Sequence, residues 1–464
     1  MILKTRTAYF YPSLLRIWPA FVIASILLAA WPGYLSFDSA LQFSQARNGI
    51  YFDIAPPAFP WLWHVWLKIL PATGGMLLMF FVFYAAGFTA LAMQRLRQDQ
   101  SWTGRLYIVL LPLCPPLLLL LPHLWTDVLL AACLLCCYAF YILNETKVPA
   151  LDSPQNHAKN VSSFSGVRLV MLALLCGLAA TIRHNSILAV LPFLAAAAWW
   201  QMPAFGLFKR MLMLAATVLA IVGFNRVVSA ALIERKLDTW AVSMMFDLQA
   251  VSIEKNQLLL PVTMVGPGMS VAQLIQAYNP YSGTLLFSGT QSGVVNPTIS
   301  PLSLEHAQQL RSAWLKVLPE PSFWAHRWRL MRGLFGTHRS AELRGLADAP
   351  LLVAYADNPK LERSFPSLHQ RYRTGVETAF KTPIFSVGWL MLIALLLVLL
   401  RFRLLAAAKV SRIVLLLSSA WLYALPYVLV APSAELRYVL WPALASWLAL
   451  LELLPEKRQF DKLV

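Results

Sequence analysis

Apolar runs long enough to cross a lipid bilayer recur along this chain, and no other feature restricts its fold as strongly. A helix needs about 20 predominantly apolar residues to span a hydrocarbon core roughly 30 Å thick. Hydrophobic residues make up 59% of the 464 residues and charged residues only 13%, whereas soluble domains carry about a quarter charged residues. The sequence therefore predicts an all-α membrane protein with about ten transmembrane helices. The runs lie near residues 14–35, 72–94, 106–122, 128–143, 168–182, 187–200, 211–232, 384–400, 413–431 and 439–454.

Lysine and arginine side chains are concentrated in alternate connections between these runs. Cytoplasmic connections of membrane proteins carry an excess of both residues. If the N-terminus is cytoplasmic, the short outer connections are residues 122–127, 183–186 and 432–438, which contain only Arg183 and Arg437. We therefore expect a multi-pass protein of a bacterial-type cytoplasmic (inner) membrane, with both termini in the cytoplasm.

One block of about 150 residues, 233–383, is polar enough to lie outside the bilayer. The same alternation places it on the extracytoplasmic side, and apolar spacing within it predicts helices at 302–317 and 322–335. The expected parts of the chain are an N-terminal transmembrane module (1–232, with a first outer loop at 36–71), the extracytoplasmic loop domain (233–383) and C-terminal transmembrane helices (384–464).

Residues 59–70 combine three tryptophans with His64 and Lys68, directly after a Pro-Pro pair. Tryptophan is enriched where a membrane meets water, and an amphipathic helix can lie in that interface. The segment predicts an interfacial helix at the outer surface. Such a helix borders an entrance for a lipid-linked substrate, or it only anchors the fold.

Acidic and arginine side chains gather in the outer connections, while the middle of the apolar runs is nearly free of them. An ionised group at the centre of a membrane helix costs about 2.5–3.5 kcal/mol. Short turns can be built from uncharged residues, so this one-sided set predicts a functional site at the outer surface. The alternative is ordinary interfacial charges that snorkel or pair with one another. The set comprises Asp38 and Asp53 in the first outer loop, Asp127 in the second, Arg183 and His184 in the third, Arg226 near the outer end of the seventh run, and Glu435, Arg437 and Tyr438 in the last.

Short motifs in these connections are similar to those of a known enzyme family. On these motifs the chain resembles the polytopic GT-C glycosyltransferases, which include the protein O-mannosyltransferases and the aminoarabinose transferases. Each motif is short, but together they extend over most of the chain. They are Asp38, residues 53–57 (DIAPP), residues 125–128 (WTDV), residues 183–185 (RHN) and residues 435–438 (ELRY) ahead of Pro442.

Two further features of the sequence bear on this resemblance. In the long polar block, Trp314 followed by Pro319 and Arg332 looks like a helix pair of poorly characterised bacterial members. Ala55 stands where the family often has His or Lys, so no role is carried over to that position.

The resemblance implies a GT-C-like helix bundle with interfacial helices and one large extracytoplasmic loop. It implies transfer of a sugar from a polyprenyl-phosphate-linked donor to an extracytoplasmic glycan, lipid or protein acceptor. Asp38 is the candidate general base, which takes the proton of the acceptor hydroxyl as the sugar carbon inverts, by analogy with glycoside hydrolysis. Asp127 is the second candidate catalytic residue and would orient the acceptor or the base.

Arg183 and Arg437 are the candidates for binding the lipid phosphate. Its growing negative charge needs cationic donors that do not titrate. The structural alternative is a pair of salt bridges, Arg437–Glu435 and Arg183–Asp127, that only fix the helix ends. The remaining expected substrate-binding residues are Asp53, His184, Glu435 and Tyr438.

No cofactor is expected, because the sequence contains no His/Cys cluster at metal-ligand spacing. Asp127 nevertheless offers one ligand for a divalent ion. Nucleic acid is not an expected partner despite the net charge of +17, because no Lys/Arg tract with interleaved aromatic residues occurs.

Two other classes of membrane protein fit the composition. A transporter or lipid flippase would be equally apolar, but it should carry ionisable residues at mid-membrane and inverted repeats, and the sequence shows neither clearly. A membrane scaffold that uses the long loop for partners would need only ordinary loop charges. The one-sided acid and arginine set favours the enzyme.

Overall fold

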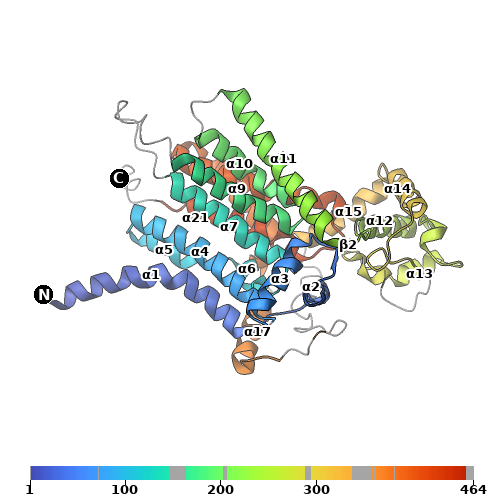
Figure 1. Ribbon diagram of the computed structural model, residues 1–464, viewed down its shortest axis with the longest axis horizontal. Helices are drawn as coiled ribbons and strands as arrows, with labels where there is room; N and C mark the ends of the chain where they lie inside the picture. The colour runs from blue at the N-terminus through green and yellow to red at the C-terminus, as the bar shows by residue number, and fades with distance from the viewer. Residues whose placement is uncertain are drawn as a thin grey trace.

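The computed structural model describes residues 2–71, 73–145, 164–201, 206–287, 294–336, 358, 362–380 and 382–455, and it shows a helical membrane protein. In Figure 1 the apolar helices run side by side in one bundle, and a smaller helical unit lies at one end of it. The bundle helices are α1 (Ile2–Ala29), α4 (Gly75–Gln98), α5 (Trp102–Leu110), α6 (Pro115–Leu120), α7 (Thr126–Glu145), α9 (Phe164–Ile182), α10 (Ser186–Gln201), α11 (Leu207–Leu232), α18 (Val387–Arg401), α19 (Ala407–Ala424), α20 (Tyr427–Val430) and α21 (Leu440–Glu452).

Six helical segments of the described chain are long and apolar enough to cross a membrane. Three shorter apolar helices lie at Ser13–Ala29, Val170–Ile182 and Ser186–Trp199. The expected total of about ten, and the side of the membrane on which each end lies, stay predictions. The six segments are Gly75–Gln98, Trp102–Leu120, Thr126–Asn144, Leu207–Leu232, Val387–Leu404 and Ala407–Val430.

Prolines interrupt two of the expected runs. The run at 106–122 forms two helices, α5 and α6, separated by residues 111–114. Pro112 lies in that break and Pro115 opens α6, while Pro426 separates α19 from α20. A proline lacks a backbone N–H and disfavours the helical conformation of the residue before it, so each break falls where the sequence places a proline.

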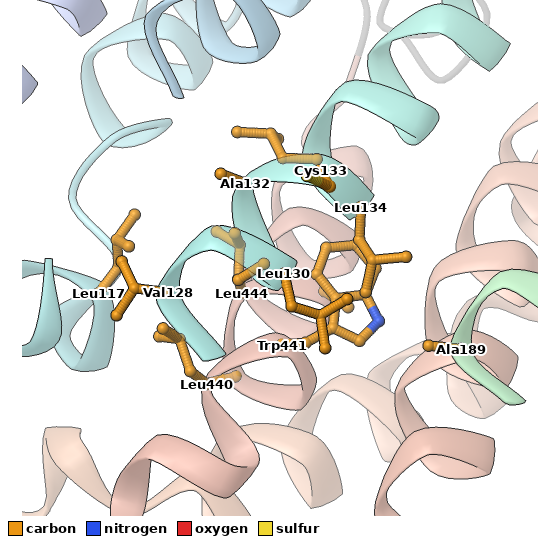
Figure 2. Packing of buried hydrophobic residues seen from close by; sticks show 14 of the residues in the cluster. Leu117, Val128, Leu130, Ala132, Cys133, Leu134, Ala189, Leu440, Trp441 and Leu444 are labelled. Atoms are coloured by element: carbon orange, nitrogen blue, oxygen red, sulfur yellow. The ribbon is translucent and has the colours of Figure 1, made fainter. Parts of the chain in front are cut away.

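Helix α7 occupies the centre of the bundle. It is apolar on every face, and 83% of the residues in its apolar stretch are buried. Figure 2 shows Leu130 and Leu134 of α7 around the ring of Trp441 from α21. The Trp441 indole N–H donates to Oγ of Ser419 at 2.9 Å, so this large ring is buried with its polar atom paired.

Helix α11 lies at the periphery instead, because only 6% of its apolar stretch is buried. Figure 1 shows it crossing α9 and α10 diagonally. A helix that is apolar all round and uncovered by protein suits a lipid environment.

The end of the bundle that carries the smaller unit is built from the longer connections. These form α2 (Phe37–Asn48), β1 (Tyr51–Phe52), α3 (Ala58–Ile69), β2 (Ile233–Arg235), α12 (Trp240–Lys255), η1 (Val262–Met264), α13 (Val271–Gln276), η2 (Gly283–Leu286), α14 (Leu304–Val317), α15 (Pro321–Leu334), α17 (Pro366–Phe380), η3 (Pro383–Phe385) and η5 (Leu436–Val439), while η4 (Phe402–Leu404) follows α18. The helices expected at 302–317, 322–335 and 59–70 are found as α14, α15 and α3.

Two contacts join these connections to one another. Strand β1 pairs in parallel with β2, Tyr51 opposite Ile233, so the loop at residues 36–71 is tied to the chain that leaves α11. In α15, Arg327 donates to the carbonyl oxygen of Ala431 at 2.8 Å, which anchors the α12–α15 unit to the connection before α21. This unit also has its own apolar core, with Leu248 and Leu310 fully buried.

Helix α3 differs from the expected amphipathic pattern in one respect. Trp61, Val65 and Ile69 form an exposed apolar stripe at a spacing of four residues, and Trp63 is buried. His64 is partly buried, and its Nδ1 donates to the carbonyl of Ala46 in α2 at 2.6 Å.

Candidate functional site

Residues from all the expected outer connections line one cavity of about 680 Å³. The cavity lies between α2, the loop after β1, the connections around 125, 184 and 435, and the α12–α15 unit. Seven of the eight predicted site residues line it. They are Asp38, Asp53, Arg183, His184, Glu435, Arg437 and Tyr438.

Asp38 lies in the first turn of α2. The Ser36 N–H donates to Oγ of Ser39 at 2.8 Å, which caps this end of the helix. A carboxylate near a helix N-terminus is favoured by the helix dipole. The Asp38 side chain is 46% exposed, so it is available to a molecule in the cavity.

Arg437 is the cationic partner of Asp38. Its Nη2 lies 2.5 Å from Oδ2 of Asp38, and its Nε lies 2.5 Å from Oε2 of Glu435, without the alignment of a hydrogen bond. Burial lowers the pKa of Arg437, but Glu435 and Asp38 more than offset this and raise it well above the usual value. Arg437 is therefore a permanent charge shared between two carboxylates.

The plane of the guanidinium is supported by aromatic rings. Arg437 lies over the Trp125 ring at 4.8 Å and over the Tyr438 ring at 5.1 Å. The Trp125 N–H donates to Oγ of Ser36 at 2.6 Å. Glu435 is in turn held by a bond from Ser433 at 2.8 Å. Cation–π contact and these bonds fix the orientation of the arginine fork.

Arg183 and Asp127 form a second ion pair deeper in the protein. Nη1 of Arg183 lies 2.6 Å from Oδ2 of Asp127, whose side chain is 1% exposed. Asp127 does not line the cavity, whereas the neighbouring Thr126 does. The structure thus places Asp127 beneath Arg183 as its counter-ion rather than beside a molecule in the cavity.

Tyr438 connects the two pairs. Arg183 lies over its ring at 5.2 Å, and Arg437 over the same ring at 5.1 Å. The ring is stacked on Tyr427 at 5.3 Å. Both arginines therefore share one aromatic support.

Asp53 and His184 lie on the cavity wall outside this cluster. Asp53 accepts a bond from the Leu237 N–H at 2.5 Å, and burial raises the pKa of its carboxyl. Burial and the charges of Arg183 and Arg226 lower the pKa of His184, so this imidazole is neutral near pH 7 and offers hydrogen bonds rather than charge.

The cluster holds three carboxylates and two guanidiniums: Asp38, Glu435 and Asp127 with Arg437 and Arg183. Within the part of the chain that the structure describes, no group of three or more His, Cys, Asp or Glu residues is arranged to hold a metal ion. The chemistry that this set offers is proton acceptance by Asp38 and anion binding by arginine forks.

The sequence did not single out several residues of the cavity wall. Gln42 and Gln45 follow Asp38 along α2, and helical spacing of three or four residues would have suggested them. Trp240 and Trp314 lie about 200 and 280 residues further along the chain. Trp314 belongs to the motif noted in the long polar block, but that motif does not place it at this cavity. Nothing local in the sequence signals their proximity to Asp38.

Comparison with known proteins adds no relative to this chain. No family model, no curated protein and no solved structure matches it.

Proposed function

We propose that this chain is a polytopic membrane glycosyltransferase of the GT-C type. It would move a sugar from a polyprenyl-phosphate-linked donor to an extracytoplasmic acceptor, which is a glycan, a lipid or a protein of the cell envelope. The observation that carries the proposal is the pairing of an accessible carboxylate, Asp38, with the buried, aromatic-supported Arg437 in a cavity at one end of a membrane bundle.

The reaction follows from these groups. The acceptor oxygen attacks the anomeric carbon as the bond from that carbon to the phosphate oxygen breaks, and the configuration inverts. Asp38 takes the proton of the acceptor hydroxyl, a contribution of about 10²–10⁴-fold. The bonding electrons leave with the phosphate, whose charge is bound by Arg437 and Arg183.

In the structure Asp38 is bonded to Arg437. A donor phosphate that binds Arg437 takes the place of Asp38, and the released carboxylate is then free to accept the acceptor proton. Asp127 has a positioning role in this scheme, because it holds Arg183 from below. Tyr438, His184, Asp53 and Glu435 shape the cavity around the donor and acceptor.

The proposed placement is a bundle of about ten transmembrane helices in the inner membrane of a bacterial-type cell. Its termini are cytoplasmic, and its cavity and large loop face outside. The Lys/Arg distribution supports this placement, since Arg183 and Arg437 are the only lysine or arginine residues in the short connections that contribute to the cavity.

The test is transfer of a labelled sugar from purified polyprenyl-phosphate sugars to extracted envelope material. Asp38→Asn should lower turnover by about 10²–10⁴-fold with an unchanged melting temperature, because the side chain is half exposed. Glu254→Gln is the matched control, since Glu254 is also half exposed and lies outside the cavity.

Near wild-type turnover of the Asn variant would assign the base to another group. Uptake or flipping of the lipid-linked sugar without its consumption would instead identify a transporter.

A further inference from the structure

The cavity wall contributed by the α12–α15 unit and the chain before it differs from the wall that carries the arginines. It presents two tryptophans, Trp240 at the start of α12 and Trp314 in α14. The residues from 237 to 314 that line the cavity are Leu237, Thr239, Trp240, Val242, Ser243, Met244, Thr284, Thr298 and Trp314. Every one of these described lining residues is uncharged.

Carboxylates behind the wall fix both indoles. The Trp240 N–H donates to Oδ1 of Asp238 at 2.9 Å, and Oδ2 of Asp238 accepts the Leu302 N–H at 2.8 Å. The Trp314 N–H donates to Oδ2 of the buried Asp247 at 2.7 Å. Because each N–H is already bonded, both rings are held in one orientation. Arg311, which does not line the cavity, lies over one face of the Trp240 ring at 4.5 Å. The surface that Trp240 offers the cavity is therefore the rest of its ring.

Asp247 is itself locked in place. It forms an ion pair with Arg327 at 2.5 Å, and the side chains of both residues are at most 1% exposed. Trp314 thus rests on a buried charge pair whose two residues do not line the cavity. Such a supporting layer behind an aromatic ring is what a pre-organised binding surface requires.

The chemistry of this wall selects one kind of ligand. A phosphate would need cations, which lie on the other wall, and a lipid chain would need a continuous aliphatic surface. A pyranose has one face of weakly positive C–H groups, which pack on the negative face of an aromatic ring. Its hydroxyls can donate to the side-chain oxygens of Thr284 and Thr298, and the Thr298 hydroxyl itself donates to Asn296 at 2.7 Å.

We propose that Trp240 and Trp314 form a carbohydrate subsite. If the proposed transfer function holds, on which this step rests, the subsite holds the acceptor, and the acceptor is a glycan rather than a protein or a simple lipid. The cavity would then bind the donor phosphate at the arginines and the receiving sugar at the tryptophans.

The first experiment measures sugar binding without a donor. Full-length protein in lipid nanodiscs is mixed with maltotriose, mannotriose or chitotriose, and saturation transfer from protein to the ring protons is recorded by NMR. We expect transfer to at least one trisaccharide, with affinity about tenfold lower in Trp240→Ala and Trp314→Ala. Trp314→Phe should retain part of the binding, because the aromatic face remains.

Trp328→Ala is the matched control. Trp328 lies in α15 of the same unit, is 67% exposed and does not line the cavity. Saturation transfer should be unchanged in this variant. Should Trp314→Ala fail to fold, Trp240→Ala and Trp314→Phe still decide the question.

The subsite would be overturned if the wild-type protein gave no NMR saturation transfer to any of the three sugars. It would also be overturned if Trp240→Ala bound the sugars as tightly as the wild type. A transferase assay separates this inference from the proposed function. If the protein binds sugar but consumes no donor, the subsite is supported and the transferase function is refuted. If the protein transfers sugar but Trp240→Ala raises KM only for the donor, the acceptor subsite is refuted and the transferase function stands.

Discussion

At the scale of single residues, the two arginines differ in how deeply their counter-ions are buried. The Asp127 side chain is 1% exposed, against 46% for Asp38. Removing one partner of a buried pair costs about 3–5 kcal/mol, whereas an exposed pair contributes up to about 1 kcal/mol. We therefore expect Arg183→Ala, which leaves the buried Asp127 unpaired, to lower the melting temperature much more than Arg437→Ala, which leaves the partly exposed Asp38 and Glu435. Both variants should slow sugar transfer.

A double variant checks the cause. Arg183→Ala combined with Asp127→Asn removes the uncompensated charge and should recover part of the lost stability. Equal melting temperatures for the two single variants would contradict this account. Unchanged rates of sugar transfer in both single variants would show that the ion pairs only fix the helix ends.

Asp53 provides a pH-dependent prediction. Burial raises its pKa, so the folded state disfavours the ionised form. The stability that this carboxyl contributes is present below its unfolded pKa and is lost as the pH rises through its folded pKa. Asp53→Asn can still accept the Leu237 N–H, so it should melt above the wild type at pH 7 and level with it near pH 3.

Thermal unfolding of both proteins across that pH range measures the difference. A difference that stays constant between pH 3 and pH 7 would show that ionisation of Asp53 is not its source. If the Asn variant is more stable at pH 7 yet transfers less sugar, Asp53 is retained for substrate rather than for the fold.

At the scale of secondary-structure elements, the packing of α4 against α7 depends on a glycine at residue 87. A Cβ on Gly87 of α4 would lie 2.8 Å from Cγ of Leu135 in α7, while a Cβ on Gly223 of α11 would have no neighbour within 4 Å. Overpacking a tight interface costs about 1–3 kcal/mol. Gly87→Val should therefore lower the melting temperature, and Gly223→Val should leave it nearly unchanged. Equal effects of the two would mean that helix propensity rather than packing sets the loss.

Helices are the part of this fold that the sequence predicts best. The apolar runs located the bundle helices, and Pro112 and Pro426 carried the signal for breaks that a count of apolar residues passes over. The pairing of Tyr51 with Ile233 was beyond local inference. Two short strands about 180 residues apart contain no pattern that names their partner.

The site was predictable in a similar measure. The charges in the connections at one end of the bundle indicated eight candidate residues, and seven of them line one cavity. They lie close together because short connections at the same end of a bundle must do so. Salt bridges of Arg183 with Asp127 and of Arg437 with Glu435 are the structural alternative that the sequence predicts. The sequence does not predict the bond from Arg437 to Asp38, since 399 residues separate them.

At the scale of the whole molecule, the orientation of the cavity relative to the membrane is the prediction with the widest consequences. A cysteine at Ser300 should react with an impermeant thiol reagent added to intact cells, and one at Gln100 should react only after permeabilisation. Both positions are exposed, and no native cysteine is fully exposed.

The reverse labelling pattern would place the cavity in the cytoplasm. A nucleotide sugar would then be the more natural donor. Labelling of both positions in intact cells would contradict either orientation.

The bond between Arg437 and Asp38 has a consequence for selectivity. A phosphodiester, whether in a donor or in an ordinary membrane lipid, carries one negative charge, the same as the carboxylate that it must displace. Replacing the carboxylate of Asp38 by the phosphate therefore gains little binding free energy before the reaction begins. A departing phosphate develops a second charge, and only then does the guanidinium interact more strongly than it did with Asp38. We expect the site to bind abundant anionic lipids weakly and to stabilise mainly the transition state.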